Sequence, residues 1–94
     1  MLHGGYMRVH TATGSVFLSA RMREILNEAV KSNQFRHERD PDLFPVIELV
    51  RMGALINSGL PTHDINCYAI FFPTALGIAM AVAVALSDGS EIWV

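Results

Sequence analysis

The chain has few charged residues and a single cysteine. Asp, Glu, Lys and Arg make up 17% of its 94 residues, and none of them occurs between Asp64 and Asp88. The net charge of −2 gives no basic field that would attract nucleic acid and no acidic field for a cationic partner. One cysteine, Cys67, cannot form an intrachain disulfide, so we expect a reducing, cytoplasmic environment.

The sequence also lacks the short motifs of common catalytic, nucleotide and metal sites. It has no glycine-rich phosphate loop, no His-Glu-x-x-His and no paired Cys-x-x-Cys. His63 and Cys67 would share a face if their segment were helical, and could then form a nucleophile and base pair or half of a metal site. A small buried cysteine near a helix start is the commoner explanation. We therefore expect no enzymatic activity, no cofactor and no metal.

A long uncharged block, residues 65 to 87, raises the question of a membrane span. About 20 apolar residues cross a bilayer, and residues 65–86 would be long enough. From Ile78 to Leu86, however, large residues alternate with alanine. This period of two is typical of a strand, which would place all the large side chains on one face. A buried strand pair is the expectation, and membrane insertion of residues 65–86 is the alternative.

Hydrophobic periodicity predicts two main helices, over residues 16 to 33 and 42 to 58. The first would begin after Ser15, a good N-cap residue, with apolar residues on one side and charged residues on the other. The second would stop at Gly59. Most of the circumference of this second helix is apolar, so it needs cover on more than one side.

The remaining segments give weaker or more local signals. Residues 61–72 fit either a short helix or a buried strand, and the start signal formed by Pro61 and Asp64 slightly favours the helix. Asp88-Gly89 is a strong signal for a two-residue hairpin turn, which would pair the alternating segment with the strand that follows it.

These elements predict one small domain, residues 1–94, of the α+β class. Two main helices would pack on a C-terminal antiparallel β-hairpin or small sheet. Residues 1–14 contain three glycines and no helical period, so they would be flexible or form an edge strand.

Apolar residues exceed what one small core can bury. The chain is 51% hydrophobic, whereas a domain of this size buries only about two-thirds of the surface that its unfolded chain exposes. The surplus predicts an interaction surface. The leading hypothesis is a small non-enzymatic regulatory protein that binds and inhibits a larger protein partner, for example as an antiactivator of a transcription factor, and that forms a homodimer.

The candidate partner or dimer interface lies on the second helix and the hairpin. Glu48 and Arg51 form a narrow charged strip on that helix. The apolar side chains beside this strip are expected to face a partner, together with the tryptophan of the hairpin: Leu49, Met52, Ile56 and Trp93. A subunit of a membrane-associated assembly with residues 65–86 inserted is the second hypothesis, and a small enzyme using Cys67 and His63 is the third.

Overall fold

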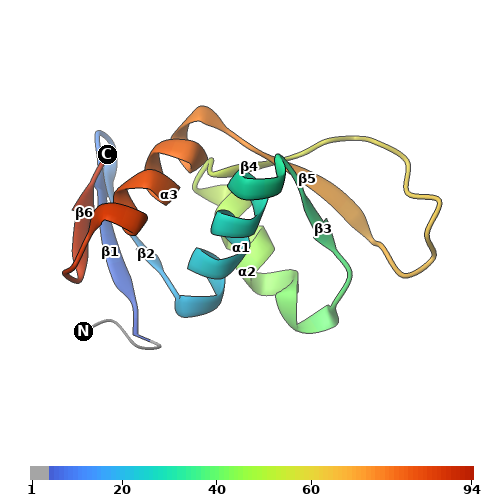
Figure 1. Ribbon diagram of the computed structural model, residues 1–94, viewed down its shortest axis with the longest axis horizontal. Helices are drawn as coiled ribbons and strands as arrows, with labels where there is room; N and C mark the ends of the chain where they lie inside the picture. The colour runs from blue at the N-terminus through green and yellow to red at the C-terminus, as the bar shows by residue number, and fades with distance from the viewer. Residues whose placement is uncertain (1–4) are drawn as a thin grey trace.

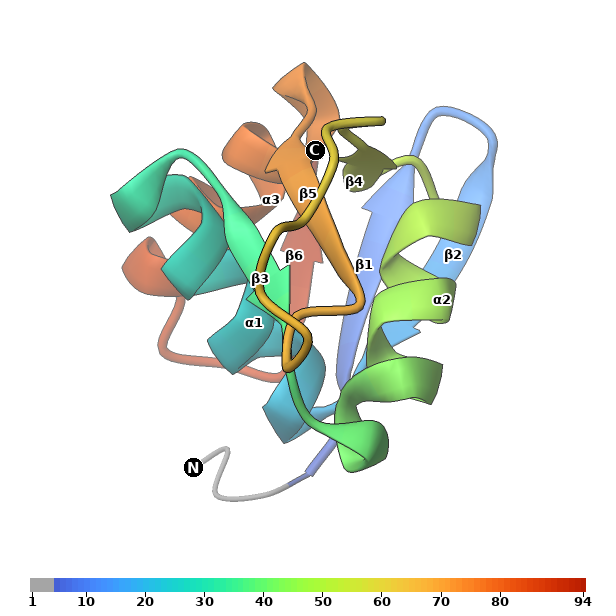
Figure 2. The same cartoon turned by 90° about the vertical axis from the view of Figure 1, so that its right-hand side faces the viewer.

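Two small β-sheets lie on either side of three α-helices in the computed structural model, which describes residues 5–94 (Figure 1, Figure 2). The elements in chain order are β1 (Met7–Thr11), β2 (Gly14–Leu18), α1 (Ala20–Ser32), β3 (Phe35–His37), the 3₁₀-helix η1 (Asp40–Asp42), α2 (Leu43–Arg51), β4 (Leu55–Asn57), β5 (Ala69–Pro73), α3 (Ala75–Leu86) and β6 (Glu91–Trp93). Sheet A has the strand order β2-β1-β6, and sheet B has the order β3-β5-β4.

In sheet A, strands from the two ends of the fold lie side by side. β1 pairs with β2 in antiparallel and with β6 in parallel. Successive side chains of a strand point to opposite faces. Met7 and Val9 of β1 are therefore buried against the helices, whereas Arg8 and His10 face outward.

Sheet B has β5 as its central strand, with antiparallel partners on both sides. Phe35 of β3 pairs with Phe71 of β5, and both side chains are buried in the core. On the opposite face Ile56 of β4 pairs with Phe72, and both side chains are exposed. Each sheet thus has one face covered by helices and one face left open.

Helix α1 lies between the sheets and packs against both of them and against α2 and α3. Ser19 caps the helix, because its Oγ accepts a hydrogen bond from the Met22 N–H at 3.2 Å. Four residues at helical spacing are fully or nearly fully buried: Met22, Ile25, Leu26 and Ala29. Burying one such Leu or Ile side chain contributes about 1.5–3 kcal/mol, so this stripe forms the centre of the core.

The N-terminal part of the chain differs from the prediction in two ways. Residues 14–18 form β2, and the first helix begins at Ala20, because Ser15 to Leu18 alternate in register with β1 and Ser19 is the N-cap. The predicted edge strand is also wrong, since β1 is the central strand of sheet A. Residues 1–4 of the segment predicted to be flexible lie outside the described residues.

Residues 78–86 form a helix, which contradicts the predicted strand. Thr74 is the N-cap of α3, and its Oγ1 accepts a hydrogen bond from the Gly77 N–H at 3.0 Å. Alanine has the highest intrinsic helix propensity, so the alternating alanines favour a helix when a cap is present. Within residues 5–94, no helix is both long and apolar enough to span a bilayer.

The hairpin predicted at Asp88-Gly89 does not form. The residues that precede this turn belong to α3, so their peptide groups are already hydrogen-bonded within the helix. β6 instead pairs with β1, through register partners such as Val9 and Ile92. The C-terminal strand therefore completes a sheet that was begun near the start of the chain.

The second helix is shorter than the predicted range of residues 42 to 58. It ends at Arg51, because Gly53 adopts a positive φ of 81° and turns the chain into β4. The slight preference for a helix in residues 61–72 was also wrong. Asp64 caps only a local turn, in which its Oδ1 accepts a hydrogen bond from the Asn66 N–H at 2.8 Å, and β5 then begins at Ala69.

The α+β class is confirmed by these elements. The predicted arrangement of two helices on a C-terminal hairpin is not found, because the strands are distributed along the chain and form two separate sheets.

The start of α3 touches the backbone between α2 and β4. The Thr74 N–H donates to the Ala54 carbonyl oxygen at 3.1 Å, and the Thr74 hydroxyl donates to the Gly53 carbonyl. A Cβ atom added to Gly77 would lie 2.1 Å from the Ala54 carbonyl oxygen. Only glycine fits at position 77 without moving the backbone.

Gly77→Ala should therefore destabilise the protein by about 3 kcal/mol or more, because neither contacting backbone can move without breaking the helix cap. Urea unfolding followed by circular dichroism measures the difference. Gly89→Ala is the matched control, since a Cβ at that position meets nothing within 4 Å. Equal midpoints for the two variants would contradict the close approach of α3 to Ala54.

A bidentate ion pair joins α1 to the start of α2. Nε and Nη2 of Arg21 donate to Oδ1 and Oδ2 of Asp42, each at 2.8 Å, and the Asp42 side chain is almost fully buried. The hydrogen bonds from Arg21 lower the pKa of Asp42 below its ordinary value. This pair fixes the N-terminal end of α2 relative to α1.

Asp42→Asn should destabilise the protein by about 1–3 kcal/mol at pH 7, because it leaves a partly buried guanidinium without its carboxylate. The folded-state pKa of Asp42 is lowered, so its stabilisation is present above the unfolded value of about 3.9 and is lost as the pH falls through the folded value. The difference in free energy of unfolding between the two proteins should therefore begin to shrink below about pH 4 and disappear once the pH is below the lowered folded-state pKa of Asp42. The exposed Asp88→Asn serves as the control, and a difference that persists unchanged to pH 2 would argue against the pair.

Candidate binding site

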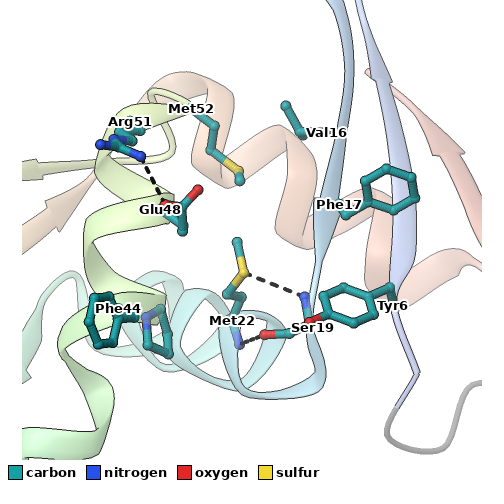
Figure 3. A pocket seen from close by; sticks show the side chains of 10 residues that line it. Tyr6, Val16, Phe17, Ser19, Met22, Phe44, Glu48, Arg51 and Met52 are labelled. Carbon is teal, nitrogen blue, oxygen red and sulfur yellow. Dashed lines mark hydrogen bonds and ion pairs between the residues drawn. The ribbon is translucent and has the colours of Figure 1, made fainter.

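A groove of ≈ 620 Å³ runs between β2 and α2 (Figure 3). Ten residues line it, and most of them are apolar: Tyr6, Val16, Phe17, Ser19, Met22, Phe44, Pro45, Glu48, Arg51 and Met52. The volume lies within the range of about 300–1,000 Å³ that is usual for ligand sites. The groove is formed by segments that are distant in the sequence, because β2 and α2 are separated by α1 and sheet B residues.

The wall of the groove on the side of sheet A carries two exposed aromatic rings, from Phe17 of β2 and from Tyr6, which precedes β1. Tyr6 is 68% exposed and Phe17 is 50% exposed. Their rings meet edge to face, with centroids 6.4 Å apart. The Arg8 guanidinium lies over the Phe17 ring at 5.2 Å and so orients it from the neighbouring strand.

The opposite wall is formed by helix α2. Phe44 is 75% exposed, and Pro45 occupies the first turn, where its missing N–H has no helical partner to lose. Glu48 and Arg51 form an exposed ion pair at 3.2 Å on the rim. These two are the only charged residues among the ten that line the groove, so the wall presents a neutral, mainly apolar surface.

Two methionines form the floor of the groove, and their side chains point toward each other in Figure 3. Met22 is buried, and the Ser19 N–H donates to its Sδ at 3.5 Å. Met52 is half-buried and contacts the core from the end of α2. Flexible thioether side chains adapt to apolar groups of different shapes, which suits a floor that contacts a partner.

The four residues predicted to form an interface lie in different surroundings. Leu49 is fully buried in the core, so its expected outward position is wrong: it lies on the side of α2 that faces the core. Met52 lines the groove. Ile56 is exposed on β4 beside Phe72, and Trp93 is exposed on β6. The structure therefore does not bring these four side chains together.

His63 and Cys67 do not share a helix face, because the segment that contains them is irregular. Cys67 is buried and its thiol contacts the Ala69 carbonyl oxygen at 3.5 Å, whereas His63 is exposed. Among residues 5–94, no group of three or more His, Cys, Asp or Glu side chains is arranged to hold a metal ion.

A polar group on the outer face of sheet A was not anticipated from the sequence. His10 Nδ1 lies 3.0 Å from Ser15 Oγ, His10 Nε2 lies 2.9 Å from Glu91 Oε1, and the imidazole stacks on Trp93 with centroids 4.8 Å apart. The four residues come from three adjacent strands. Cross-strand pairs of this kind stabilise the register of a sheet.

Sequence reasoning missed the aromatic side of the groove because it assigned residues 16–18 to a helix. The alternation of Ser15, Val16, Phe17 and Leu18 was the available signal, since it places Val16 and Leu18 on one face and Phe17 on the other.

Comparison with known proteins adds no family assignment to this geometry. No protein-family model matches the chain, and no significant match was found among curated proteins or among solved structures.

Proposed function

We propose that this chain is a small non-enzymatic interaction protein that binds an apolar segment of a larger protein in the groove between β2 and α2. One observation carries the proposal: three aromatic side chains, Tyr6, Phe17 and Phe44, stand at least half exposed around a floor of methionines. Aromatic and Met side chains are enriched in protein interfaces. The proposed consequence is regulatory, because an apolar segment held in the groove is withheld from its other contacts, as in an antiactivator of a transcription factor.

The free energy available from burying the exposed rings supports the binding of an apolar partner in the groove. Fully burying one large apolar side chain contributes about 1.5–3 kcal/mol, so covering three exposed rings can offset much of the cost of association, about 4–15 kcal/mol. The charged residues of the groove, Glu48 and Arg51, bind each other on the rim. An apolar partner can therefore enter without leaving a charge unpaired in a desolvated site.

Phe44→Glu should abolish capture of the partner, because a carboxylate would have to be desolvated in the interface. The side chain is 75% exposed, so the fold should be unchanged by circular dichroism. The experiment compares proteins retained from an extract of the source cells by the wild type, by Phe44→Glu and by the control Leu60→Glu, whose side chain is exposed on a loop away from the groove.

The proposal expects a protein that the wild type and Leu60→Glu both retain and Phe44→Glu loses. Met52→Glu tests the floor of the groove in the same assay, with thermal stability measured alongside because Met52 is half-buried. Identical sets of retained proteins for all variants would show that the groove is not the contact surface.

A second proposal concerns self-association through α3, and it rests on a different surface. The twelve residues Ala75–Leu86 include no polar side chain. Ile78, Val82 and Leu86 are exposed along one stripe of this helix, with Leu86 83% exposed. An uncharged stripe of this kind can be covered by a second copy without opposing like charges.

The order of large and small residues suits an antiparallel pair of α3 helices. If the twofold axis passes between residues 80 and 81, Ala75 of one copy lies opposite Leu86 of the other, and Ala79 lies opposite Val82. Leu86 and Val82 then each meet a small side chain, which allows close packing. Burial of the exposed stripe on both copies would contribute on the order of 5–8 kcal/mol, against an association cost of at least about 4 kcal/mol. The dimer should therefore be weak and depend on concentration.

Val82→Glu should shift the protein fully to monomer in sedimentation equilibrium, while the wild type shows a concentration-dependent dimer. A charge at the centre of the stripe would be desolvated on each copy. The control is Ile65→Glu, because Ile65 is 93% exposed in the loop before β5 and distant from α3 in sequence. A monomeric wild type at millimolar concentration would exclude this proposal and leave the groove proposal intact.

A further inference from the structure

β2 has a free edge that borders the groove, and α2 lies across the groove from this strand. β2 is the outermost strand of sheet A, and β1 occupies its other side. Figure 3 shows α2, the groove, β2 and β1 in that order across the view. None of the described residues pairs with β2 on the groove side. The groove therefore has a hydrogen-bonding wall as well as an apolar one.

The direction of the peptide groups in β2 follows from the bonds of β1. The Arg8 N–H donates to the Ser90 carbonyl at 2.9 Å, and the His10 carbonyl accepts from the Val94 N–H at 3.0 Å. The peptide groups of Arg8 and His10 therefore point toward β6. Because successive residues of a strand direct their N–H and C=O to opposite sides, the N–H and C=O of Val9 point toward its register partner Val16 in β2. The N–H and C=O of Ser15 and Phe17 consequently point away from β1, toward the free edge.

We propose that the groove takes an extended peptide segment, which adds to β2 as a fourth strand of sheet A. This inference rests on the proposed function of the groove and names the conformation and chemistry of its occupant. Phe17 and Ser15 each offer one N–H and one C=O, which an added strand can satisfy. A partner that covered these N–H and C=O groups without forming hydrogen bonds to them would bind less favourably. The unpaired edge therefore favours a partner with an extended backbone.

Side chains of the added strand would alternate between two environments. One set points to the core side of the sheet, as Val16 does, and meets the methionines of the floor, Met22 and Met52. The next set points outward, as Phe17 does, and meets the aromatic rings of Phe17 and Tyr6. The occupant is therefore a segment with large apolar side chains at successive positions and no charge in its centre, since the rim pair Glu48 and Arg51 is neutral overall.

A helical segment is the competing occupant and makes a different prediction. A helix satisfies its own peptide groups, so it would leave those of Phe17 and Ser15 unpaired and would show a period of 3.6 in its contact residues. An added strand uses alternate peptide groups and shows a period of two.

The experiment starts from a displayed library of random ten-residue peptides selected against the complete chain. Peptides whose binding is lost with Phe44→Glu and retained with Leu60→Glu occupy the groove. One such peptide is then synthesised with a single N-methyl group at each position in turn. The hydrogen-exchange rates of the Ser15 and Phe17 amides are measured with and without the unmodified peptide, and the Val16 amide, already bonded to β1, is the internal control.

Strand addition predicts that N-methylation weakens binding at every second position, by about three- to tenfold for each lost hydrogen bond. It also predicts that exchange at Ser15 and Phe17 slows by tenfold or more, while Val16 changes little. A selected peptide that tolerates N-methylation without a period of two, and leaves Ser15 and Phe17 unprotected, would overturn strand addition and keep the groove proposal. Failure to select any peptide sensitive to Phe44→Glu would overturn both.

Discussion

The attachment of helix α2 at its two ends is the constraint on which the groove depends. At the N-terminal end Asp42 is bound by Arg21 of α1. Beyond the C-terminal end the Ala54 carbonyl accepts from Thr74 and lies against Gly77. Both attachments join α2 to the other helices, and neither joins it to β2. The side of α2 that faces β2 is therefore held apart from that strand, and the groove between them stays open.

The sequence predicts an element correctly where the spacing of its apolar residues matches the side chains that the fold buries. In α1, the residues Met22, Ile25 and Leu26 recur at helical spacing and are buried. In the segment from Ile78 to Leu86 the two do not match. Its large residues recur at every second position, but Met80 is buried while Ile78 and Val82 are exposed. A capping threonine and the helix propensity of alanine determined the structure there. The pairing of β6 with β1 had no local signal at all.

The site was less predictable than the fold, because its walls come from separate parts of the chain. Met52 was expected to contact a partner and does line the groove, whereas Leu49, three positions earlier on the same helix, belongs to the core. Which apolar stripe of α2 faces inward depends on where α1 lies, and the sequence of α2 alone does not contain that information. Tyr6 and Phe17 could be placed opposite Phe44 only after β2 was known to be an edge strand.

The parallel pairing of β1 with β6 imposes an order on folding. His10 and Glu91, which bond across these strands, are 81 residues apart, whereas the β1 and β2 hairpin closes over a two-residue turn. The hairpin can therefore form early, and sheet A is completed only after residue 93 has been synthesised. Until then, one edge of the five-residue strand β1 is unpaired. In the complete fold, the three-residue strand β6 covers this edge. The unfinished sheet thus has a second open edge along β1, on the side opposite the groove, where mispairing and aggregation can begin.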